Sequence, residues 1–312
     1  MCRDENIMEK QKTALIFIIL PAIFVAVGIL FFPYEPQFDS ITLLSLVNFT
    51  GLILLAIGYL LKVNKKEHII KVIGWALVAF FWSTQINALY YGEDGDFINA
   101  FFCSAGIFLL FYVAYHEWLS YEKKETVSCL NWIAGAAAIA GLIYSLIELS
   151  PLQMWLRETV ASQSGMVLDI FVDNVAVDGI FISWKSALIN LIFACTAVQS
   201  MVLFVGIILP LPKVELKRKI IGLAITVIPV YFLNLVRNAL VVYLTGFYGD
   251  DFFSMAHNVI AKILSLIALI ILLFILIKIM PEVFNEISCL IDLPKRKGPI
   301  ERFINKAIGR KK

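Results

Sequence analysis

Long apolar runs separated by short polar connections set the pattern of this chain. A transmembrane helix needs about 20 consecutive apolar residues. The segments that reach this length lie near residues 13–32, 40–61, 69–90, 97–116, 129–148, 185–211, 219–245 and 256–280. The pattern therefore predicts an all-α integral membrane protein, a bundle of about eight transmembrane helices that forms a single membrane domain over residues 1–312.

The composition agrees with this class of protein. Of the 312 residues, 60% are hydrophobic and only 16% are charged, whereas a soluble domain is nearer half apolar and a quarter charged. The net charge of +2 gives no reason to expect a nucleic-acid partner. No small-residue cleavage site follows the apolar stretch 13–32, so we expect a retained first span and not a removed signal peptide.

The Lys and Arg content of the connections alternates along the chain. The N-terminus, the second, fourth and sixth connections and the tail 281–312 all carry basic clusters. The remaining connections, including the long one over 149–184, hold only Arg157, with Lys185 at a border. The positive-inside rule then predicts a multi-pass protein of the cell membrane with both termini and the basic tail in the cytoplasm.

The long connection over 149–184 is predicted to be extracytoplasmic and partly strand-like. Its segment "MVLDIFVDNVAVDGIFIS" places β-branched and apolar residues around "DN" and "DG". This pattern is typical of short strands joined by tight turns. An ordered cap without a function and a substrate-docking element are equally compatible with it.

Reactive side chains occur in each of the last three predicted spans, as Cys195, Arg237 and His257. At 1.5 Å per residue, Cys195 lies about 15 Å and Arg237 about 12 Å from the outer ends of their spans. His257 lies in the first turns of its span, so all three are expected in the outer leaflet. A guanidinium in hydrocarbon costs at least a few kcal/mol, which predicts an anionic group or an anionic transition state beside Arg237.

The neighbours of Arg237 add a polar face. Asn234, Arg237 and Asn238 follow at i, i+3 and i+4, and Tyr231 extends the same face. In this constellation a Cys195 thiolate would be the nucleophile, and Arg237 would stabilise the thiolate or an oxyanion. His257 would exchange protons with the thiol and the leaving amine, while Asn234 or Asn238 would orient the guanidinium or donate to the oxyanion.

Each of these residues is also compatible with a role outside catalysis. A cysteine is a common small residue in membrane helices, and a histidine or arginine there can be interfacial or ion-paired. Arg237 could instead anchor the substrate of a transporter or flippase for an anionic lipid or glycan, or the chain could be a non-catalytic assembly factor. Cys103 has a comparable depth, but only Ser104 gives it a polar neighbour.

The cysteines show no recognisable framework. Cys2, Cys103, Cys129, Cys195 and Cys289 match no zinc or disulfide spacing. We therefore expect separate thiols. The three histidines, His68, His116 and His257, are scattered across both membrane faces, so we also expect no metal site, and we expect no cofactor.

The segments "ACTAVQS" around Cys195, "NLVRNALVVY" around Arg237 and "AHNVIAKILS" around His257 resemble the Cys–Arg–His set of the exosortase/archaeosortase family of membrane transpeptidases. Within that family the chain is most similar to the archaeosortase A branch in size and span count. The resemblance is specific over about 165–270. It departs from the family where Ala197 and Val198 stand in place of the glycines that often follow the cysteine. Some archaeosortases also place an arginine at the position of His257.

The resemblance implies a thiol protease and transpeptidase of the hydrolase class. Such an enzyme cleaves a C-terminal sorting signal, made of a Pro-Gly-Phe-type motif, a transmembrane helix and a basic tail, from secreted proteins such as S-layer glycoproteins. It then transfers the new C-terminus to a membrane lipid. The implied roles are nucleophile and thioester carrier for Cys195, electrostatic stabiliser for Arg237, and proton donor and acceptor for His257.

Overall fold

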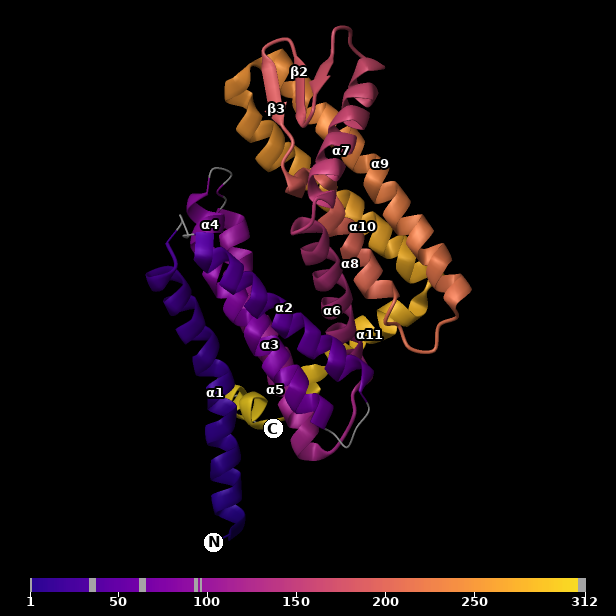
Figure 1. Ribbon diagram of the computed structural model, residues 1–312. Coiled ribbons are helices and arrows are strands. Elements are labelled where there is room, and N and C mark those ends of the chain that lie inside the picture. Colours follow the sequence, from indigo (N-terminus) through magenta and orange to yellow (C-terminus); the bar gives the residue numbers. More distant parts are fainter. Residues whose placement is uncertain (1, 34–37, 62–65, 93–94, 96, 308–312) are drawn as a thin grey trace. The chain divides into compact units, whose positions relative to one another are not determined.

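The computed structural model describes residues 2–33, 38–61, 66–92, 95 and 97–307 (Figure 1). It divides into two compact units, unit 1 with Met1–Ala138 and Glu286–Lys312, and unit 2 with Ile139–Asn285. Seven helices of the described part are long and apolar enough to cross a membrane, and one small three-stranded sheet accompanies them. These findings confirm an all-α membrane protein with a small strand-like region.

Unit 1 is built from helices that pack through aromatic and small residues. Phe24 meets Phe80 and Phe111 edge to face, with ring centroids 5.5 and 5.2 Å apart. The helices of this unit are α1 (Cys2–Phe31), α2 (Phe38–Leu60), α3 (Lys66–Thr84), α4 (Ile86–Tyr91), α5 (Phe97–Lys123) and the first half of α6 (Ser128–Glu148), followed at the other end of the chain by most of α11 (Pro281–Ile291), by η4 (Leu293–Arg296) and by α12 (Pro299–Ala307).

The tail is tied to α5 by polar contacts. The Arg296 guanidinium donates to Ser120 Oγ at 2.9 Å and to Glu125 Oε1 at 2.5 Å. The hydroxyl of Tyr115 donates to Glu301 Oε2 at 2.9 Å. The hydrogen bond from Arg296 lowers the pKa of the Glu125 carboxyl. The described part of the basic tail is therefore ordered against the protein, while the predicted tail residues 308–312 lie outside the described part.

Unit 2 contains the rest of α6 and the small sheet. Its elements are α7 (Leu152–Asp169), β1 (Ala176–Asp178), β2 (Phe181–Trp184), β3 (Ala187–Asn190), η1 (Phe193–Thr196), α8 (Val198–Ile208), α9 (Leu216–Tyr248), η2 (Asp250–Phe252), η3 (Met255–Ala261), α10 (Lys262–Ile279) and the start of α11. The strands run antiparallel in the order β1-β2-β3, with Asp178 opposite Phe181 and Ile182 opposite Ile189. The strands predicted around "DG" are confirmed, but much of the predicted loop, including "MVLD", is helical in α7.

The sequence prediction of one transmembrane helix over 185–211 is wrong. Residues 187–190 pair as β3, residues 193–196 form a 3₁₀ turn, and α8 has only 11 residues. Eleven residues rise about 16 Å, roughly half of the hydrocarbon thickness. The helix begins only after Ala197, whose left-handed backbone (φ +61°) interrupts the preceding turn. Cys195 consequently lies in a short turn before α8 and not inside a continuous helix.

The expectation of separate thiols is also wrong for one pair. Cys129 and Cys289 form a disulfide across 160 residues of sequence. Local spacing gives no sign of such a distant pair. Cys103 and Cys195 are buried thiols outside this disulfide.

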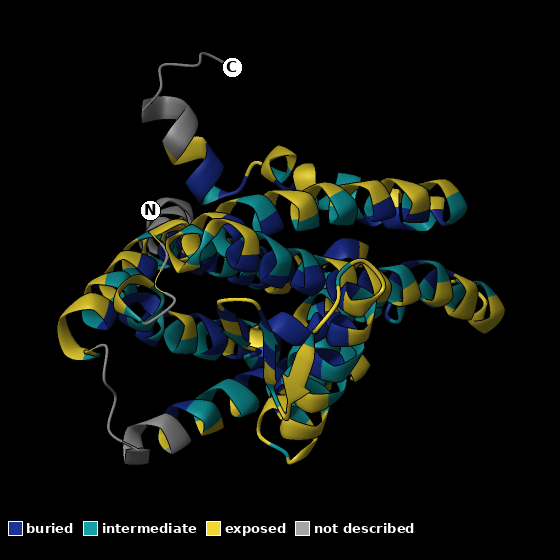
Figure 2. Cartoon of the chain, turned by 90° about the horizontal axis from the view of Figure 1, so that it is seen from above, coloured by how far each residue is buried: buried dark blue, intermediate teal, exposed yellow. Residues whose placement is uncertain are grey.

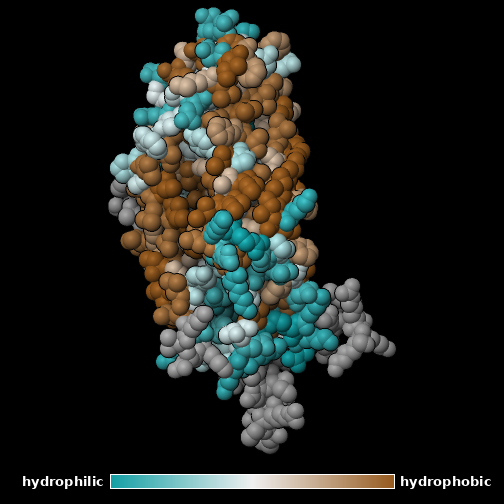
Figure 3. Space-filling model, turned by 90° about the vertical axis from the view of Figure 1, so that its right-hand side faces the viewer, coloured by the Kyte–Doolittle hydropathy of each residue, from teal (hydrophilic) through white to brown (hydrophobic). Residues whose placement is uncertain are grey.

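Apolar side chains cover much of the outer surface of the helices. Leu30, Leu109 and Phe274 expose 75%, 65% and 68% of their area. Exposed positions recur along the long helices in Figure 2, and Figure 3 shows a broad hydrophobic area on the face in view. Such an area suits contact with lipid, because large contiguous apolar patches are rare on soluble monomers.

Gly246 permits the close approach of α9 to the sheet. A Cβ atom there would lie 2.5 Å from Trp184 Cε3 and 2.7 Å from the Trp184 carbonyl oxygen. We expect Gly246→Ala to lower the free energy of unfolding by about 1–3 kcal/mol, because the backbone carbonyl has to move. Thermal denaturation in detergent measures this. Helix propensity alone would make Gly246→Ala stabilising, because alanine favours a helix more than glycine does. A higher melting temperature in this variant would therefore contradict the close approach.

Candidate active site around Cys195

Cys195 lies in the tight turn that joins the sheet to α8. Its backbone N–H donates to the Ile192 carbonyl at 2.9 Å, and Thr196 Oγ1 donates to the Phe193 carbonyl at 2.7 Å. Cys195 is 7% exposed and belongs to the core cluster formed by α7, β2, β3 and α9. The turn therefore holds the thiol at a defined position just before the N-terminus of α8.

Two asparagines of α9 hold the backbone of this cysteine. Asn234 Nδ2 donates to the Cys195 carbonyl at 2.7 Å, and Asn238 Nδ2 donates to the same oxygen at 3.1 Å. Both asparagines are buried. The predicted polar face of α9 is thus directed at the cysteine turn, and in the structure its amides contact the Cys195 backbone.

Helix α7 supplies polar partners that sequence reasoning missed. The Tyr231 hydroxyl donates to Gln163 Oε1 at 2.7 Å, so Tyr231 ties α9 to α7. Asn238 Nδ2 lies 3.5 Å from Ser164 Oγ. The short polar run "SQS" within an otherwise apolar stretch is the one local signal of these contacts.

Arg157 of α7 fastens the segment that leads into the cysteine turn. Its Nε donates to the Leu191 carbonyl at 2.7 Å, and its Nη2 lies 3.4 Å from Asn190 Oδ1. This contact gives a structural reason for an arginine in a connection that is otherwise nearly free of basic residues.

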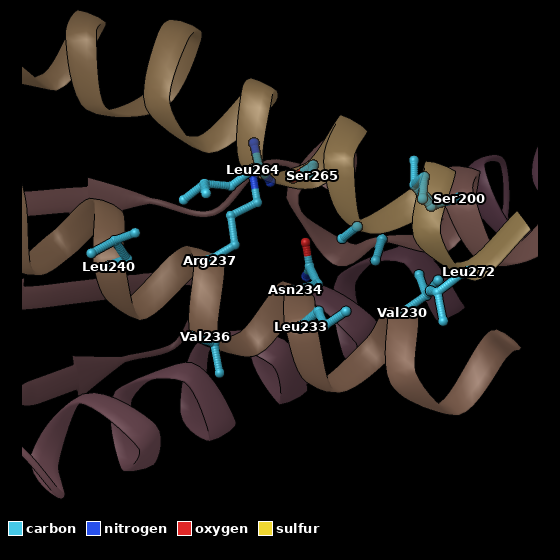
Figure 4. A pocket seen from close by; sticks show the side chains of 13 residues that line it. Ser200, Val230, Leu233, Asn234, Val236, Arg237, Leu240, Leu264, Ser265 and Leu272 are labelled. Carbon is cyan, nitrogen blue, oxygen red and sulfur yellow. The ribbon is translucent and has the colours of Figure 1, made fainter. Parts of the chain in front are cut away.

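Arg237 lines a cavity of about 250 Å³ beside the cysteine turn. Ala197 and Ser200, which follow Cys195, line the same cavity, as do Leu264 and Ser265 of α10. In Figure 4 the nitrogens of Arg237 are directed toward α10, while the oxygen of Asn234 is directed into the cavity. Arg237 Nε is buried and has no hydrogen-bond partner among the described residues. A cation held this way can receive an anionic group.

His257 lies in a π-helical segment, η3, that precedes α10. Its ring stacks on Phe253 with centroids 5.3 Å apart. Its neighbours Ala256 and Ala261 are buried against Val241, one turn beyond Arg237 on α9. The structure therefore links Asn234 and Asn238 to the Cys195 backbone and places Asn234 in the same cavity as Arg237. Neither Cys195 nor His257 is among the described residues that line this cavity.

Ala197 adopts a backbone conformation that favours glycine. Its φ is +61° and its side chain lines the cavity. We expect Ala197→Gly to raise the free energy of unfolding by about 1 kcal/mol, because glycine carries no steric penalty in the left-handed region. The melting temperature in detergent reports the change. Ala268→Gly, within the regular helix α10, is the control and should be destabilising; destabilisation of both variants alike would contradict strain at Ala197.

Residues 48–275 match the model of the family described as Transmembrane exosortase (Exosortase_EpsH). This match includes every residue of the candidate site and covers well over half of the chain. Searches of curated proteins and of solved structures returned no match.

Proposed function

This chain belongs to the transmembrane exosortase family, and on that premise we propose that it is a membrane cysteine transpeptidase that removes C-terminal sorting signals from secreted proteins. The observation that carries the proposal is the pairing of a fixed cysteine turn with a partly unsatisfied arginine. Asn234 and Asn238 both donate hydrogen bonds to the Cys195 carbonyl. Arg237 lines the same cavity as Ala197 and Ser200, which follow the cysteine in the sequence.

The reaction uses these groups in two steps. The Cys195 thiolate attacks the carbonyl carbon of the scissile peptide bond, and the oxyanion that forms is stabilised by Arg237. The C–N bond then breaks, and the leaving amine takes a proton from His257 acting as general acid. A hydroxyl or amine acceptor, or water, then attacks the thioester carbonyl and gives its proton to the now neutral His257. The C–S bond breaks, and Cys195 leaves as the thiolate with which the reaction began.

The start of α8 adds to the stabilisation of negative charge. Ala197 is the N-cap of this 11-residue helix and makes no side-chain cap hydrogen bond. Helix geometry directs the first N–H groups of α8 toward the residues that precede the helix, and the positive end of the helix dipole favours an anion there. This arrangement would stabilise both the Cys195 thiolate and the oxyanion of the intermediate.

The cavity suits a substrate that arrives through the lipid. Leu233 and Val236 line it and expose 46% and 54% of their area. A sorting signal with a transmembrane helix would reach Cys195 laterally, with its cleavage site at the outer membrane surface. The resemblance to archaeosortase A implies the finer identity of the substrate. On that basis we propose a secreted protein such as an S-layer glycoprotein with a Pro-Gly-Phe-type motif, and a membrane lipid as acceptor.

The experiment that tests the function is the mass of a surface protein produced with and without this chain. In its presence the protein should lose the C-terminal helix and basic tail, and a mass increase at the new C-terminus identifies a lipid acceptor. A plain carboxylate there identifies water. An uncleaved protein in both strains would contradict the proposed function.

His257 is expected to contribute through proton transfer. We predict that His257→Ala lowers the processing rate by about 10²–10⁴-fold, the range for a lost general acid–base catalyst. Initial rates on a purified substrate measure the effect, with Asn258→Ala as a neighbouring control. A wild-type rate in His257→Ala would remove His257 from the mechanism and leave proton transfer to solvent.

A further inference from the structure

Three side chains with metal-binding atoms meet in unit 1, whereas the candidate active site belongs to unit 2. Cys129 lies at the start of α6, and Glu286 and Cys289 lie one turn apart on α11. One ligand atom from each of these residues lies within 4.8 Å of the others. The Cα atoms of the two cysteines are 5.9 Å apart. The reaction at Cys195 uses none of these groups.

The carboxylate of Glu286 lacks part of the compensation that a buried charge requires. Glu286 is 8% exposed, and its Oε1 accepts a hydrogen bond from Ser128 Oγ at 2.7 Å. Its Oε2 is buried and has no hydrogen-bond partner among the described residues. Apolar side chains surround the two sulfurs, with Leu130 and Leu293 in the same cluster. A buried, incompletely satisfied carboxylate is costly unless a cation neutralises it.

The charge pattern places this cluster on the side where thiols are kept reduced. Lys123 and Lys124 precede α6, and three consecutive basic residues, 295–297, follow α11. By the positive-inside rule this end faces the cytoplasm, where the glutathione and thioredoxin pools reduce most disulfides. We therefore expect the disulfide to be reduced in that compartment, so that the cluster offers two thiols and a carboxylate.

We propose that Cys129, Cys289 and Glu286 bind a zinc ion when the two cysteines are reduced. Thiolates select a soft cation such as Zn²⁺ over Mg²⁺ or Ca²⁺. Zn–S bonds of about 2.3 Å in tetrahedral geometry put two sulfurs roughly 3.8 Å apart, which the present Cα separation permits. Water completes the four ligands, and Ser128 orients the carboxylate from outside.

The exchange between the two forms balances. A cellular dithiol reduces the disulfide with two electrons and two protons and itself becomes a disulfide. Zinc binding then releases the two thiol protons. Either form clasps α11, and with it the tail, to α6, so the inference is independent of the reaction at Cys195.

The test is zinc binding to the full-length chain in detergent. The chain is reduced with a phosphine, stripped with a chelator and titrated with Zn²⁺ against a chromogenic competitor. We expect roughly one tightly bound Zn²⁺ per chain, loss of that site in Cys289→Ser, and affinity at least about ten-fold weaker in Glu286→Gln. Cys103→Ser, which removes another buried thiol of unit 1, is the control and should bind as the wild type does.

Two further readouts keep the result decisive if a variant folds poorly. Co²⁺ in place of Zn²⁺ should give thiolate charge-transfer absorption in the wild type and Cys103→Ser. Zinc should also raise the melting temperature of the reduced wild type more than that of Glu286→Gln. Equal binding or equal thermal shifts in all variants would reveal an adventitious ion only. A Cys129–Cys289 disulfide that resists the reductant would show a purely structural cross-link. Equal behaviour of all variants and a resistant disulfide would each overturn the proposal.

Discussion

Cys195→Ala is expected to abolish removal of the C-terminal helix from a sorted surface protein, with no detectable residual rate. The proposed thioester would form on the Cys195 sulfur, and no other thiol in the described part of unit 2 lies in the turn that Asn234 and Asn238 contact. Mass spectrometry of the substrate isolated from cells measures the processed fraction.

Cys103→Ala is the matched control for this prediction. Cys103 is also a buried thiol, but its Sγ lies 3.3 Å from the Trp82 carbonyl in unit 1. We expect normal processing in this variant when membrane levels of the protein are unchanged. Continued processing in Cys195→Ala would refute the nucleophile, and the transporter hypothesis, in which Arg237 anchors an anionic lipid or glycan, would then take its place.

Arg237→Ala is expected to lower the processing rate by about 10²–10³-fold, the usual effect of removing a group that stabilises an oxyanion. Arg237→Lys should recover only part of that rate, because lysine keeps the charge but loses the planar fork of donors. Initial rates on a purified substrate in detergent measure both effects.

Arg218→Ala separates this role from a general loss of positive charge. Arg218 also lies on α9, but it pairs with Glu282 at 2.6 Å. We expect its substitution to leave the rate within about two-fold of the wild type, because a partly exposed ion pair contributes little. An Arg237→Ala enzyme with a wild-type rate and wild-type stability would exclude Arg237 from transition-state stabilisation.

The sequence predicted the parts of the fold that depend on hydropathy. Seven of the eight expected spans correspond to long helices of the described part, because a helix that crosses lipid has to be continuously apolar. The face of Asn234 and Asn238 was also predictable, since helical periodicity alone brings them together.

The break before α8 escaped prediction for a physical reason. Residues 187–208 are apolar throughout most of their length, and such a run is equally compatible with a buried strand and with a helix. Pairing of β3 with β2 and the left-handed backbone of Ala197 decide between them. These are tertiary effects, and alanine gives no local signal of a turn.

Helix α7 and the disulfide escaped prediction because they depend on distant partners. The contacts of Gln163 and Arg157 lie 68 and 34 residues away along the chain, and Cys129 pairs with a cysteine 160 residues away. No periodicity in the sequence encodes such pairs. The catalytic roles of Cys195, Arg237 and His257 remain predictions. Residue type and expected depth make these residues candidates, and only an experiment on the reaction can identify their roles.

Capture of the covalent intermediate tests the central claim most directly. The purified chain is mixed with a substrate that carries the sorting signal, quenched in acid and digested for peptide mapping by mass spectrometry. The account predicts the N-terminal part of the substrate attached to the peptide that contains Cys195, through a bond that hydroxylamine cleaves. Turnover without any adduct on Cys195, or an adduct on another residue, would contradict it.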